Sequence, residues 1–255
     1  MDLGLKDQAA VVVGGAQGIG RAIADTFVME GARVGIVDCV GEVDNFSGEI
    51  CQADVADFEA VKGVATDLAS KFGQIDHVVF SVGIGSGKIG FPFWNVPPAD
   101  WMRVLEVNLL GAVHTAQAFV PFMREGDSNG RSLLFLTSVA GQIGSQTDPP
   151  YSASKAGLIN FMQCVARDLA VDGIRANALS PGMVKTALNR TVWEASGVEE
   201  SYEDWAEDKI KRVAPLGQWQ SPEEYGAMAV YLASAQAKNI TGQTINIDGG
   251  QVMHS

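Results

Sequence analysis

Cysteine, histidine and positive charge are scarce in this sequence. Its 255 residues include three cysteines, three histidines and 18 lysines and arginines, against 30 aspartates and glutamates. The net charge of −12 argues against nucleic acid or an anionic membrane surface as a partner, because both bind proteins mainly through lysine and arginine. Cys39, Cys51 and Cys164 are odd in number and lack the spacing of metal ligands, which indicates reduced thiols in a cytoplasmic protein without a metal site.

The sequence also lacks long hydrophobic runs. No stretch approaches the roughly 20 apolar residues of a membrane-spanning helix, and Asp2, Lys6 and Asp7 near the N-terminus do not suit a signal peptide. No internal repeat or low-complexity linker divides the chain. We therefore expect one globular domain over residues 1–255, a length that single α/β domains reach.

Short apolar runs instead alternate with amphipathic segments along the chain. The runs are rich in β-branched residues and predict buried strands, and the segments between them have helical periodicity. This alternation predicts a doubly wound (Rossmann) α/β fold, in which a seven-stranded parallel sheet carries helices on both faces. The expected strands are 9–13, 33–37, 49–52, 75–80, 132–136, 174–179 and 244–247, and the expected helices are 21–30, 58–72, 100–123, 151–170 and 222–233.

A glycine-rich turn follows the first expected strand. Gly14, Gly18 and Gly20 have the spacing Gly-x-x-x-Gly-x-Gly and precede an expected helix. Glycines let the backbone approach a pyrophosphate closely, and the first turn of a helix offers free N–H groups to the anion. Although glycines also make ordinary tight turns, the order of strand, turn and helix predicts a dinucleotide phosphate site.

Asp38 ends the second expected strand, 20 positions after Gly18 (38 − 18 = 20). An acidic residue at this offset can accept a hydrogen bond from a ribose 2′-hydroxyl and repels a 2′-phosphate. Gln17 in the glycine turn is neutral, which fits the same preference. Asp38 therefore predicts NAD rather than NADP, with a simple turn at the strand end as the alternative. The interval from Asp38 to Asp54 leaves room for a helical turn or two.

Tyr151 and Lys155 lie four positions apart in a run of small residues that we expect to be helical. Both side chains would project from one helix face. An ammonium beside a phenol lowers the pKa of the phenol from about 10, which would let it exchange a proton with an alcohol or carbonyl oxygen near neutral pH. The same pair also occurs on solvated helix faces. Asn108 inside an expected helix and Ser138 after an expected strand are two further candidates.

Together these features resemble the short-chain dehydrogenase/reductase family, in its shorter single-domain branch, over residues 5–250. The family's cofactor motif, Thr-Gly-x-x-x-Gly-Ile-Gly, corresponds to the stretch from Val13 to Gly20. Its Tyr-x-x-x-Lys motif corresponds to Tyr151 and Lys155, and its active-site serine to Ser138, 13 positions earlier (151 − 138 = 13). Its fourth catalytic residue, adenine contact and nicotinamide stretch correspond to Asn108, Asp54-Val55 and Pro181-Gly182-Met183-Val184-Lys185-Thr186.

The resemblance implies a role for each matching residue. Ser138 would hydrogen-bond the substrate oxygen, and Tyr151 would exchange a proton with it. Lys155 would lower the pKa of Tyr151 and hold the nicotinamide ribose, while the backbone carbonyl of Asn108 would anchor a water on the proton path. The implied cofactor residues are Gly14, Gln17, Gly18, Ile19, Gly20, Asp38, Asp54, Val55, Gly83, Asn108, Tyr151, Lys155, Pro181, Gly182, Val184 and Thr186.

Two positions depart from the family pattern. Val13 replaces the threonine of the cofactor motif and lacks its bracing hydroxyl. Phe80-Ser81-Val82-Gly83 replaces Asn-Asn-Ala-Gly, so Gly83 is kept and the first asparagine is lost. We expect these changes to alter the bracing near the adenine and the central sheet rather than the chemistry.

The expected substrate pocket is largely apolar. The polar, acidic and aromatic segment 187–214 predicts a mobile helical lid, whose aromatic residues either touch substrate or pack as ordinary core. These features predict a small or medium secondary alcohol or ketone of mainly apolar or neutral character. The expected substrate-binding residues are Ser138, Gln142, Ile143, Gly144, Ser145, Tyr151, Met183 and Trp193.

Two alternative functions stay open at this stage. A reductase of 3-oxoacyl thioesters on acyl carrier protein would belong to the same family, although the acidic chain does not favour an acidic partner. A catalytically idle NAD-sensing relative is disfavoured by the presence of Ser138, Tyr151 and Lys155. A sugar-nucleotide epimerase of the longer branch is not expected, because no substrate domain follows the last strand. The resemblance further implies a homo-oligomer, commonly a tetramer.

Overall fold

The computed structural model describes residues 2–88, 90, 92–126, 130–144, 148–184, 190, 193–194 and 197–253. Over these ranges seven strands form one parallel sheet with the order β3-β2-β1-β4-β5-β6-β7, which confirms the expected fold class. The strands are β1 (Ala9–Val13), β2 (Arg33–Asp38), β3 (Glu49–Gln52), β4 (His77–Phe80), β5 (Ser132–Leu136), β6 (Arg175–Pro181) and β7 (Thr244–Ile247).

The order of the strands places a topological switch beside β1. The chain runs outward from β1 through β2 to β3, and β4 then pairs with the other side of β1. Connections on the two sides therefore leave in opposite directions, and a crevice opens between them at the carboxyl ends of β1 and β4. This is where the glycine turn after β1 lies.

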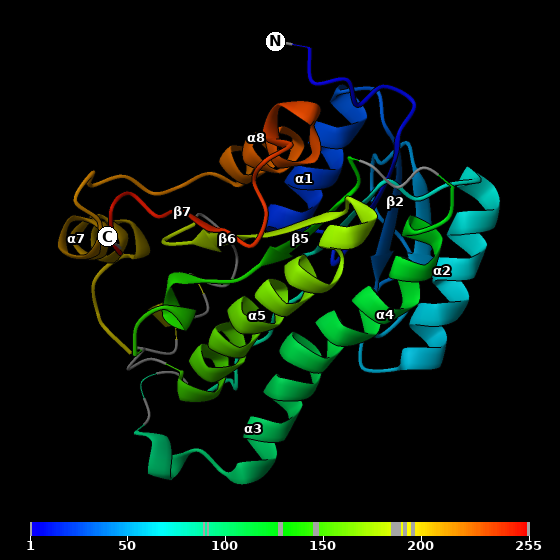
Figure 1. Ribbon diagram of the computed structural model, residues 1–255. Helices are drawn as coiled ribbons and strands as arrows, with labels where there is room; N and C mark the ends of the chain where they lie inside the picture. The colour runs from blue at the N-terminus through cyan, green and yellow to red at the C-terminus, as the bar shows by residue number, and fades with distance from the viewer. Residues whose placement is uncertain are drawn as a thin grey trace.

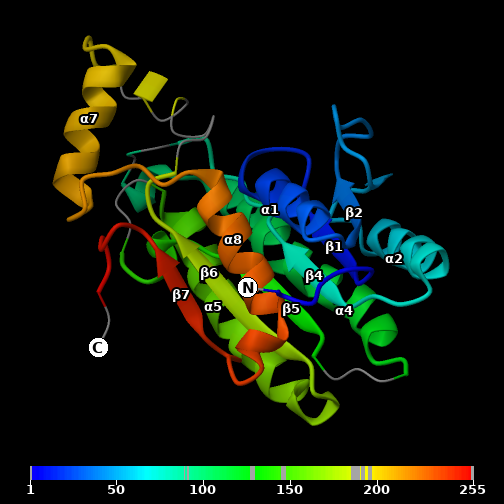
Figure 2. The same ribbon diagram turned by 90° about the horizontal axis from the view of Figure 1, so that it is seen from above.

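Helices cover both faces of the sheet (Figure 1). On one face lie α1 (Gly18–Met29) and α8 (Pro222–Ala233), and on the other lie α2 (Phe58–Phe72), α4 (Gly111–Met123) and α5 (Pro149–Asp168). Each layer encloses its own hydrophobic core, so both faces of the central strands are covered (Figure 2). Every residue of β1, β4, β5 and β6 is buried as a result, which explains the nearly continuous apolar runs of β1, β4 and β5.

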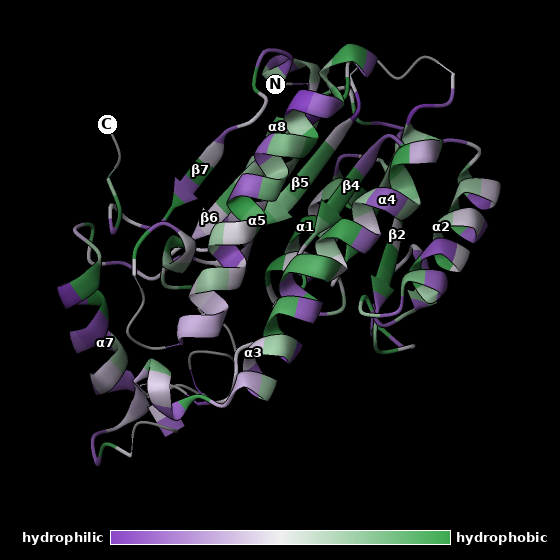
Figure 3. Ribbon diagram, turned by 60° about the horizontal axis from the view of Figure 1, so that its bottom comes forward, coloured by the Kyte–Doolittle hydropathy of each residue, from purple (hydrophilic) through white to green (hydrophobic). Residues whose placement is uncertain are grey.

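The helix α7 (Tyr202–Val213) lies outside the two layers, on the side of the carboxyl ends of the strands. It is largely hydrophilic, whereas the strands at the centre are mostly hydrophobic (Figure 3). Trp205 and Ile210 are its buried residues. Of the predicted lid 187–214, residues 187–189, 191–192 and 195–196 lie outside the described ranges. Among the described helices, none is both long and apolar enough to cross a membrane.

The expected helix 100–123 is divided into three parts. α3 (Pro98–Leu105) and α4 are joined by a π-helical turn, Glu106–Leu110, at whose centre Asn108 lies. Single π turns inside helices are frequent at functional sites. The chain between β2 and β3 contains no helix, so the helical turn or two expected there is not formed. α1 and α5 begin at Gly18 and Pro149, each earlier than expected, so both helices start at the candidate site.

Candidate active site

A cavity of about 650 Å³ opens at the carboxyl edge of the sheet. The segments that follow β1, β2, β3, β4, β5 and β6 all contribute to its wall, together with α1, α3, α5 and the π-helical turn. This is the position at which the strand order predicts a ligand site. It is lined by Gly14, Gln17, Gly18, Ile19, Gly20, Asp38, Cys39, Ala53, Asp54, Val55, Ser81, Val82, Gly83, Ile84, Arg103, Val107, Leu136, Thr137, Ser138, Tyr151, Lys155, Pro181, Gly182 and Val184.

The glycine turn is shaped so that only glycines fit. Gly14 has a φ of +83°, a backbone conformation that residues other than glycine rarely adopt. A Cβ on Gly20 would lie 2.0 Å from the carbonyl oxygen of Gly14, because the first turn of α1 packs directly on the strand end. Gln17 is the N-cap of α1 and makes no side-chain hydrogen bond to that turn. The first N–H groups of α1 are therefore available to an anion, as a pyrophosphate cradle requires.

Asp38 faces this cradle from the end of β2. Its Oδ2 accepts a hydrogen bond from the backbone N–H of Ala16 at 3.0 Å, which holds the half-buried carboxylate beside the glycine turn. The structure thus places an acidic group at the wall of the cavity where the sequence predicted a ribose contact.

The predicted adenine end contains Asp54 and Val55. Asp54 Oδ1 accepts from the N–H of Ala56 at 2.9 Å, and Oδ2 lies 3.5 Å from Nη2 of Arg103. Val55 is buried beneath α4, where a Cβ on Gly111 would lie 2.7 Å from Val55 Cγ2. Ser81 lies close to the glycine turn, since a Cβ on Gly20 would meet Ser81 Oγ at 3.0 Å. The expected loss of bracing at this position remains a prediction.

Ser138, Tyr151 and Lys155 converge on the same cavity from β5 and α5. Lys155 is buried, and its Nζ donates to the carbonyl oxygens of Leu136 at 2.8 Å and Val82 at 3.3 Å. The same Nζ lies 5.6 Å from the centre of the Tyr151 ring. Gly83 lies close to this ammonium, since a Cβ there would be 3.1 Å from Nζ. Burial lowers the pKa of Lys155 to about 7.

The expected lowering of the Tyr151 pKa is not found in this structure. Burial raises the pKa of Tyr151, and the negative charge of Asp148 raises it further, whereas a hydrogen bond with Ser138 lowers it. The physical reason for the difference is the orientation of Lys155, whose ammonium bonds two backbone carbonyls and lies beside the ring face. The pKa of that lysine near 7 also removes part of its positive charge at neutral pH.

Asn108 is fully buried and joins three segments. Its Oδ1 accepts from the N–H of Ile84 at 2.8 Å, and its Nδ2 donates to the carbonyl of Ile84 at 2.9 Å and to Ser154 Oγ at 3.0 Å. The loop after β4 is thus tied both to the π-helical turn and to α5, one residue before Lys155. Asparagine inside a helix predicted a side-chain contact for Asn108, and these hydrogen bonds are that contact. The predicted role of its backbone carbonyl remains a prediction.

Pro181, Gly182 and Val184 line the cavity after β6. Gly182 leaves no room for a side chain, because a Cβ there would lie 2.7 Å from Asp248 Cα. The predicted cofactor residue Thr186 and the predicted substrate residue Ser145 lie outside the described residues.

Four predicted substrate residues do not line the cavity: Gln142, Ile143, Gly144 and Met183. The amide of Gln142 pairs with that of Asn246 beside β7 through two hydrogen bonds of 2.8 Å, while Ile143 is 47% exposed. Trp193 is also absent from the wall, because its Nε1 donates to the carbonyl of Glu200 at 3.2 Å and its ring packs edge-on against Tyr202. The cavity wall therefore contains the predicted catalytic residues Ser138, Tyr151 and Lys155 and the described cofactor residues except Asn108, which is buried behind it. Of the described substrate residues, only Ser138 and Tyr151 line the cavity.

Sequence reasoning missed two residues at this site, Arg103 and Asp148. Arg103 on α3 lines the cavity and bonds Glu106 at 3.0 Å as well as Asp54. Asp148 is buried at the N-terminus of α5, where its side chain accepts from the N–H of Tyr151. Its signal was available, because an aspartate followed by Pro149 and Pro150 is a typical helix start. No group of described residues has the composition of a metal site.

Comparisons with known proteins agree with this geometry. The family model described as enoyl-(acyl carrier protein) reductase matches residues 14–252. Acetoacetyl-CoA reductase of Synechocystis sp. is 32% identical over 250 residues, which cover 98% of each chain. The 2-dehydro-3-deoxy-L-rhamnonate dehydrogenase (NAD(+)) of Sphingomonas sp. is 32% identical over 252 residues, which cover 96% of this chain and 95% of that protein.

A solved structure is similar over the whole chain. L-sorbose reductase from Gluconobacter frateurii, complexed with NADPH and L-sorbose, has a TM-score of 0.90 and 28% identity, with 100% of both chains covered. The family model and the relatives extend over nearly the entire sequence, and these relatives are oxidoreductases. This chain therefore belongs to the short-chain dehydrogenase/reductase family, as its motifs predicted, and is an oxidoreductase.

Proposed function

We propose that the protein transfers a hydride between NAD(H) and a secondary alcohol or ketone of small to medium size and mainly apolar or neutral character. The observation that carries this proposal is the convergence of Ser138, Tyr151 and Lys155 on one cavity with the glycine turn and Asp38. A hydroxyl, a phenol and an ammonium at one end and an anion cradle at the other are the parts that the reaction needs.

The residues fit a nicotinamide dinucleotide. The uncapped first turn of α1 and the absence of side chains at Gly14 and Gly20 suit a pyrophosphate. Asp38 beside that turn suits a ribose 2′-hydroxyl and repels a 2′-phosphate, which supports NAD. The relatives point both ways, since one is named for NAD(+) and another was solved with NADPH. The preference for NAD therefore rests on Asp38.

The chain's own residues would manage the substrate oxygen and its proton. Ser138 and Tyr151, which share a hydrogen bond, would both bond that oxygen, and Tyr151 would give it a proton in reduction or take one in oxidation. When bound, the cofactor supplies or accepts the hydride. Lys155 would hold a cofactor ribose from its buried position next to Gly83. Asn108 bonds the backbone of Ile84 and so holds the loop after β4, which lines the same cavity, in a fixed position beside these groups.

A direct test begins with cofactor binding and then measures turnover. Isothermal titration with NADH and NADPH should show tighter binding of NADH, and NADH absorbance should change in the presence of some members of a panel of secondary alcohols, neutral polyols and ketones. Binding without turnover across a broad panel would favour the idle NAD-sensing alternative. Absence of binding of either dinucleotide would refute the proposal as a whole.

Reduction of 3-oxoacyl thioesters is a second candidate, because acetoacetyl-CoA reductase is among the similar relatives. The net charge of −12 does not favour a polyanionic substrate. The four carboxylates of α7 are largely offset by Lys209, Lys211 and Arg212 on the same helix, so α7 adds little to this argument. Acetoacetyl-CoA belongs in the panel for this reason. Turnover of acetoacetyl-CoA at a higher kcat/KM than any neutral ketone would replace the first candidate by this one.

A further inference from the structure

The segment between β3 and α2 forms one end of the cavity and contains Asp54 and Val55. In the strand order, the ends of β2, β1 and β4 lie between this segment and Ser138 after β5. The groups along the cavity therefore follow one another as Asp54, Asp38, the glycine turn and Ser138. If the turn holds the pyrophosphate and Asp38 holds a ribose, the base of that nucleoside lies at Asp54 and Val55.

Two polar groups at this end match the edge of adenine. The carboxylate of Asp54 offers acceptors. The N–H of Val55 donates to no acceptor among the described residues, which leaves it available to a ligand. Adenine presents an amino donor beside the acceptor N1, whereas hypoxanthine presents a carbonyl acceptor beside an N1–H donor. An acceptor next to a donor in the protein thus favours adenine and leaves hypoxanthine with mismatched pairs.

The helical arm from α3 to α4 packs against this segment. Four of its residues follow one another three or four positions apart and so share one face of the arm: Arg103, Val107, Gly111 and His114. Gly111 lets the arm approach closely, because a Cβ there would lie 2.7 Å from Val55 Cγ2. The position of Val55 is therefore set by this arm as well as by the sheet.

His114 bonds the backbone of the segment directly. Its Nδ1 lies 2.8 Å from the carbonyl oxygen of Val55, and Nδ1 carries the proton because a carbonyl only accepts. The N–H of the same peptide, which belongs to Ala56, donates to Asp54 Oδ1 at 2.9 Å. His114 thus holds one side of a peptide whose other side holds the carboxylate. The ring of Phe58 packs beside the imidazole, with 5.4 Å between the two ring centres.

Arg103 holds the same carboxylate from a second direction. Its Nη2 lies 3.5 Å from Asp54 Oδ2, and its Nη1 donates to Glu106 Oε2 at 3.0 Å. The side chains of Arg103 and Asp54 are both about half exposed, so their ion pair adds little to the stability of the fold. The two contacts of Arg103 instead limit the directions that the carboxylate can take.

We propose that His114 is a positioning residue for the base of the dinucleotide: through the peptide of Val55 and Ala56 it fixes the Asp54 carboxylate and the Val55 N–H in the arrangement that selects adenine. This inference rests on the proposed dinucleotide binding and deepens it, since it names the residue that sets the choice of base. His114 does not line the cavity and therefore acts through Val55. Without its bond the peptide is free to turn, so the site loses discrimination between bases and keeps its other contacts.

The preference for the base can be measured with two dinucleotides that differ only there. NADH and reduced nicotinamide hypoxanthine dinucleotide are each titrated into the wild type and the variants by calorimetry, and the ratio of the two dissociation constants is compared. In His114→Leu, which removes the donor and keeps an apolar side chain beside Phe58, the preference for NADH should fall about 3- to 10-fold, as expected for one hydrogen bond. His114→Asn, whose amide can donate from the position of Nδ1, should keep the preference. Arg103→Met should lower it by a smaller factor.

Thr115→Val is the matched control on the same helix. Thr115 is buried, and its Oγ1 donates to the carbonyl of Gly111 at 2.8 Å, within the helix itself. The change should therefore lower the melting temperature and leave the preference for NADH unaltered. General loosening of α4 would weaken both dinucleotides together, and their ratio would stay the same.

Three results would overturn the inference: an unchanged preference in folded His114→Leu, an equal loss in Thr115→Val, or a loss in His114→Asn as large as that in His114→Leu. A wild type that binds both dinucleotides equally would overturn it as well. If His114→Leu unfolds, Arg103→Met decides, because an unchanged preference there would remove the Asp54 carboxylate from recognition of the base. Failure of the wild type to bind either dinucleotide would instead refute the proposed function, which all the other results leave standing.

Discussion

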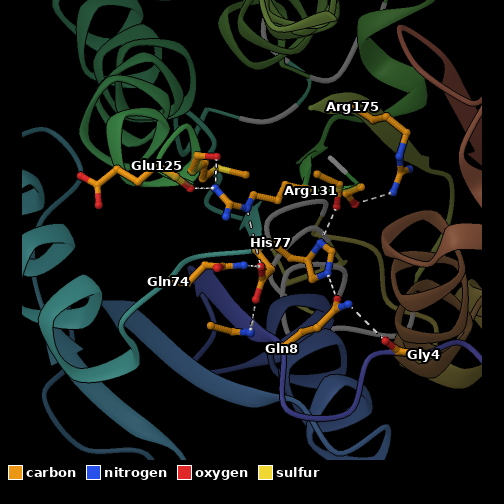
Figure 4. A network of polar contacts seen from close by, with 12 residues as sticks. Gly4, Gln8, Gln74, His77, Glu125, Arg131 and Arg175 are labelled. Carbon is orange, nitrogen blue, oxygen red and sulfur yellow. Dashed lines mark hydrogen bonds and ion pairs between the residues drawn. The ribbon is translucent and has the colours of Figure 1, made fainter. Parts of the chain in front are cut away.

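The polar residues at the two edges of the sheet have different hydrogen-bond partners. At the amino edge, buried polar side chains bond one another and the ends of helices, as Figure 4 shows. His77 Nδ1 lies 2.9 Å from Ser132 Oγ and its Nε2 lies 2.6 Å from Gln8 Oε1. Asp76 Oδ2 accepts from the N–H of Ala9 at 2.8 Å. These bonds join β1, β4 and β5 at the ends where the strands begin.

Two buried arginines complete the network at the amino edge (Figure 4). Arg131 Nη1 donates to the carbonyls of Met123 and Glu125 at the end of α4, and Arg175 donates to the carbonyls of Leu232 and Ala233 at the end of α8. The last carbonyls of a helix have no partner inside the helix and carry the negative end of its dipole. Each arginine therefore closes a helix end onto the sheet.

Both edges border a cavity, but the side chains Gln8, Asp76 and His77 that line the cavity of about 500 Å³ at the amino edge are bonded to protein partners. The carboxyl edge borders the cavity of about 650 Å³ described above. The first turn of α1 has no side-chain cap, and Ser138, Tyr151 and Lys155 reach the wall of that cavity. A parallel sheet places strand starts at one edge and strand ends at the other, so the two edges can be used independently. The difference indicates that polar groups at the amino edge maintain the fold and that those at the carboxyl edge are arranged for a ligand.

The largest effect that separates the two edges should come from Tyr151→Phe. Loss of the phenol hydroxyl should reduce turnover about 10²–10⁴-fold, because the proton donor is removed, while the NADH dissociation constant and the melting temperature stay near those of the wild type. Steady-state kinetics and isothermal titration measure the two effects. Tyr225→Phe is the control, since Tyr225 donates to the carbonyl of Ile247 at 2.7 Å and lies outside the cavity wall. Turnover like that of the wild type in Tyr151→Phe would contradict the assignment.

Arg175→Met, at the amino edge, should lower the stability of the protein and leave NADH binding unchanged. The change leaves the carbonyls of Leu232 and Ala233 buried without their donor, which should lower the free energy of unfolding by about 3 kcal/mol. Arg124→Met removes an exposed arginine that is ion-paired with Asp172, and should change the free energy by less than about 1 kcal/mol. Urea denaturation gives both values. A large loss of NADH affinity in folded Arg175→Met would break the proposed division between the edges.

His77, at the amino edge, should make the free energy of unfolding of the protein depend on pH. Burial lowers the pKa of His77 to about 4, from an ordinary value of 6.5; the charge of Asp76 opposes this shift, and Arg175 and Arg131 add to it. The unfolded chain therefore binds a proton first as the pH falls, so the contribution of His77 is complete above pH 6.5 and is lost between that value and about 4. The loss amounts to roughly 3 kcal/mol at most.

The contribution of His77 can be isolated by difference. The free energy of unfolding of wild type and of His77→Asn should be measured by urea denaturation at several pH values across this range. The stability of the wild type relative to His77→Asn should fall as the pH falls, because only the wild type contains a histidine that the unfolded chain protonates before the folded chain does. A gap that stays constant from neutral pH to pH 4 would rule out His77 as the titrating group.

The sequence predicted the carboxyl edge better than the amino edge. Gly14, Asp38 and the Tyr151–Lys155 pair could be recognised in the sequence because each lies at a fixed offset within a strand, a turn or a helix. Bounds of β3, β5, β7, α2 and α8 also agree with expectation, since apolar periodicity and caps define them locally. The network around His77 gives no such signal, because its members are far apart in the sequence and meet only when the sheet is assembled.

The same reasoning explains the errors within the site. Gln142 follows Ser138 closely in sequence, yet its amide bonds Asn246, 104 residues away, which no local pattern could show. The pKa of Tyr151 depends on burial and on the directions of Lys155 and Asp148, and spacing fixes neither. Asp148 was also missed, although its place before two prolines is typical of a helix cap, and its burial has no local signal in the sequence.

Asp38→Ala should have the smallest of these effects, and it tests the carboxyl edge alone. Removal of the carboxylate takes away the acceptor for a ribose hydroxyl and the repulsion of a 2′-phosphate. NADH affinity should fall and NADPH affinity rise, so that the ratio of the two dissociation constants changes about 10-fold, or about 1.4 kcal/mol. Asp38→Asn separates charge from hydrogen bonding, because it keeps an acceptor oxygen near the N–H of Ala16. Isothermal titration with both dinucleotides measures the change, and an unaltered or stronger preference for NADH in Asp38→Ala would remove Asp38 from the cofactor site while leaving the amino edge untouched.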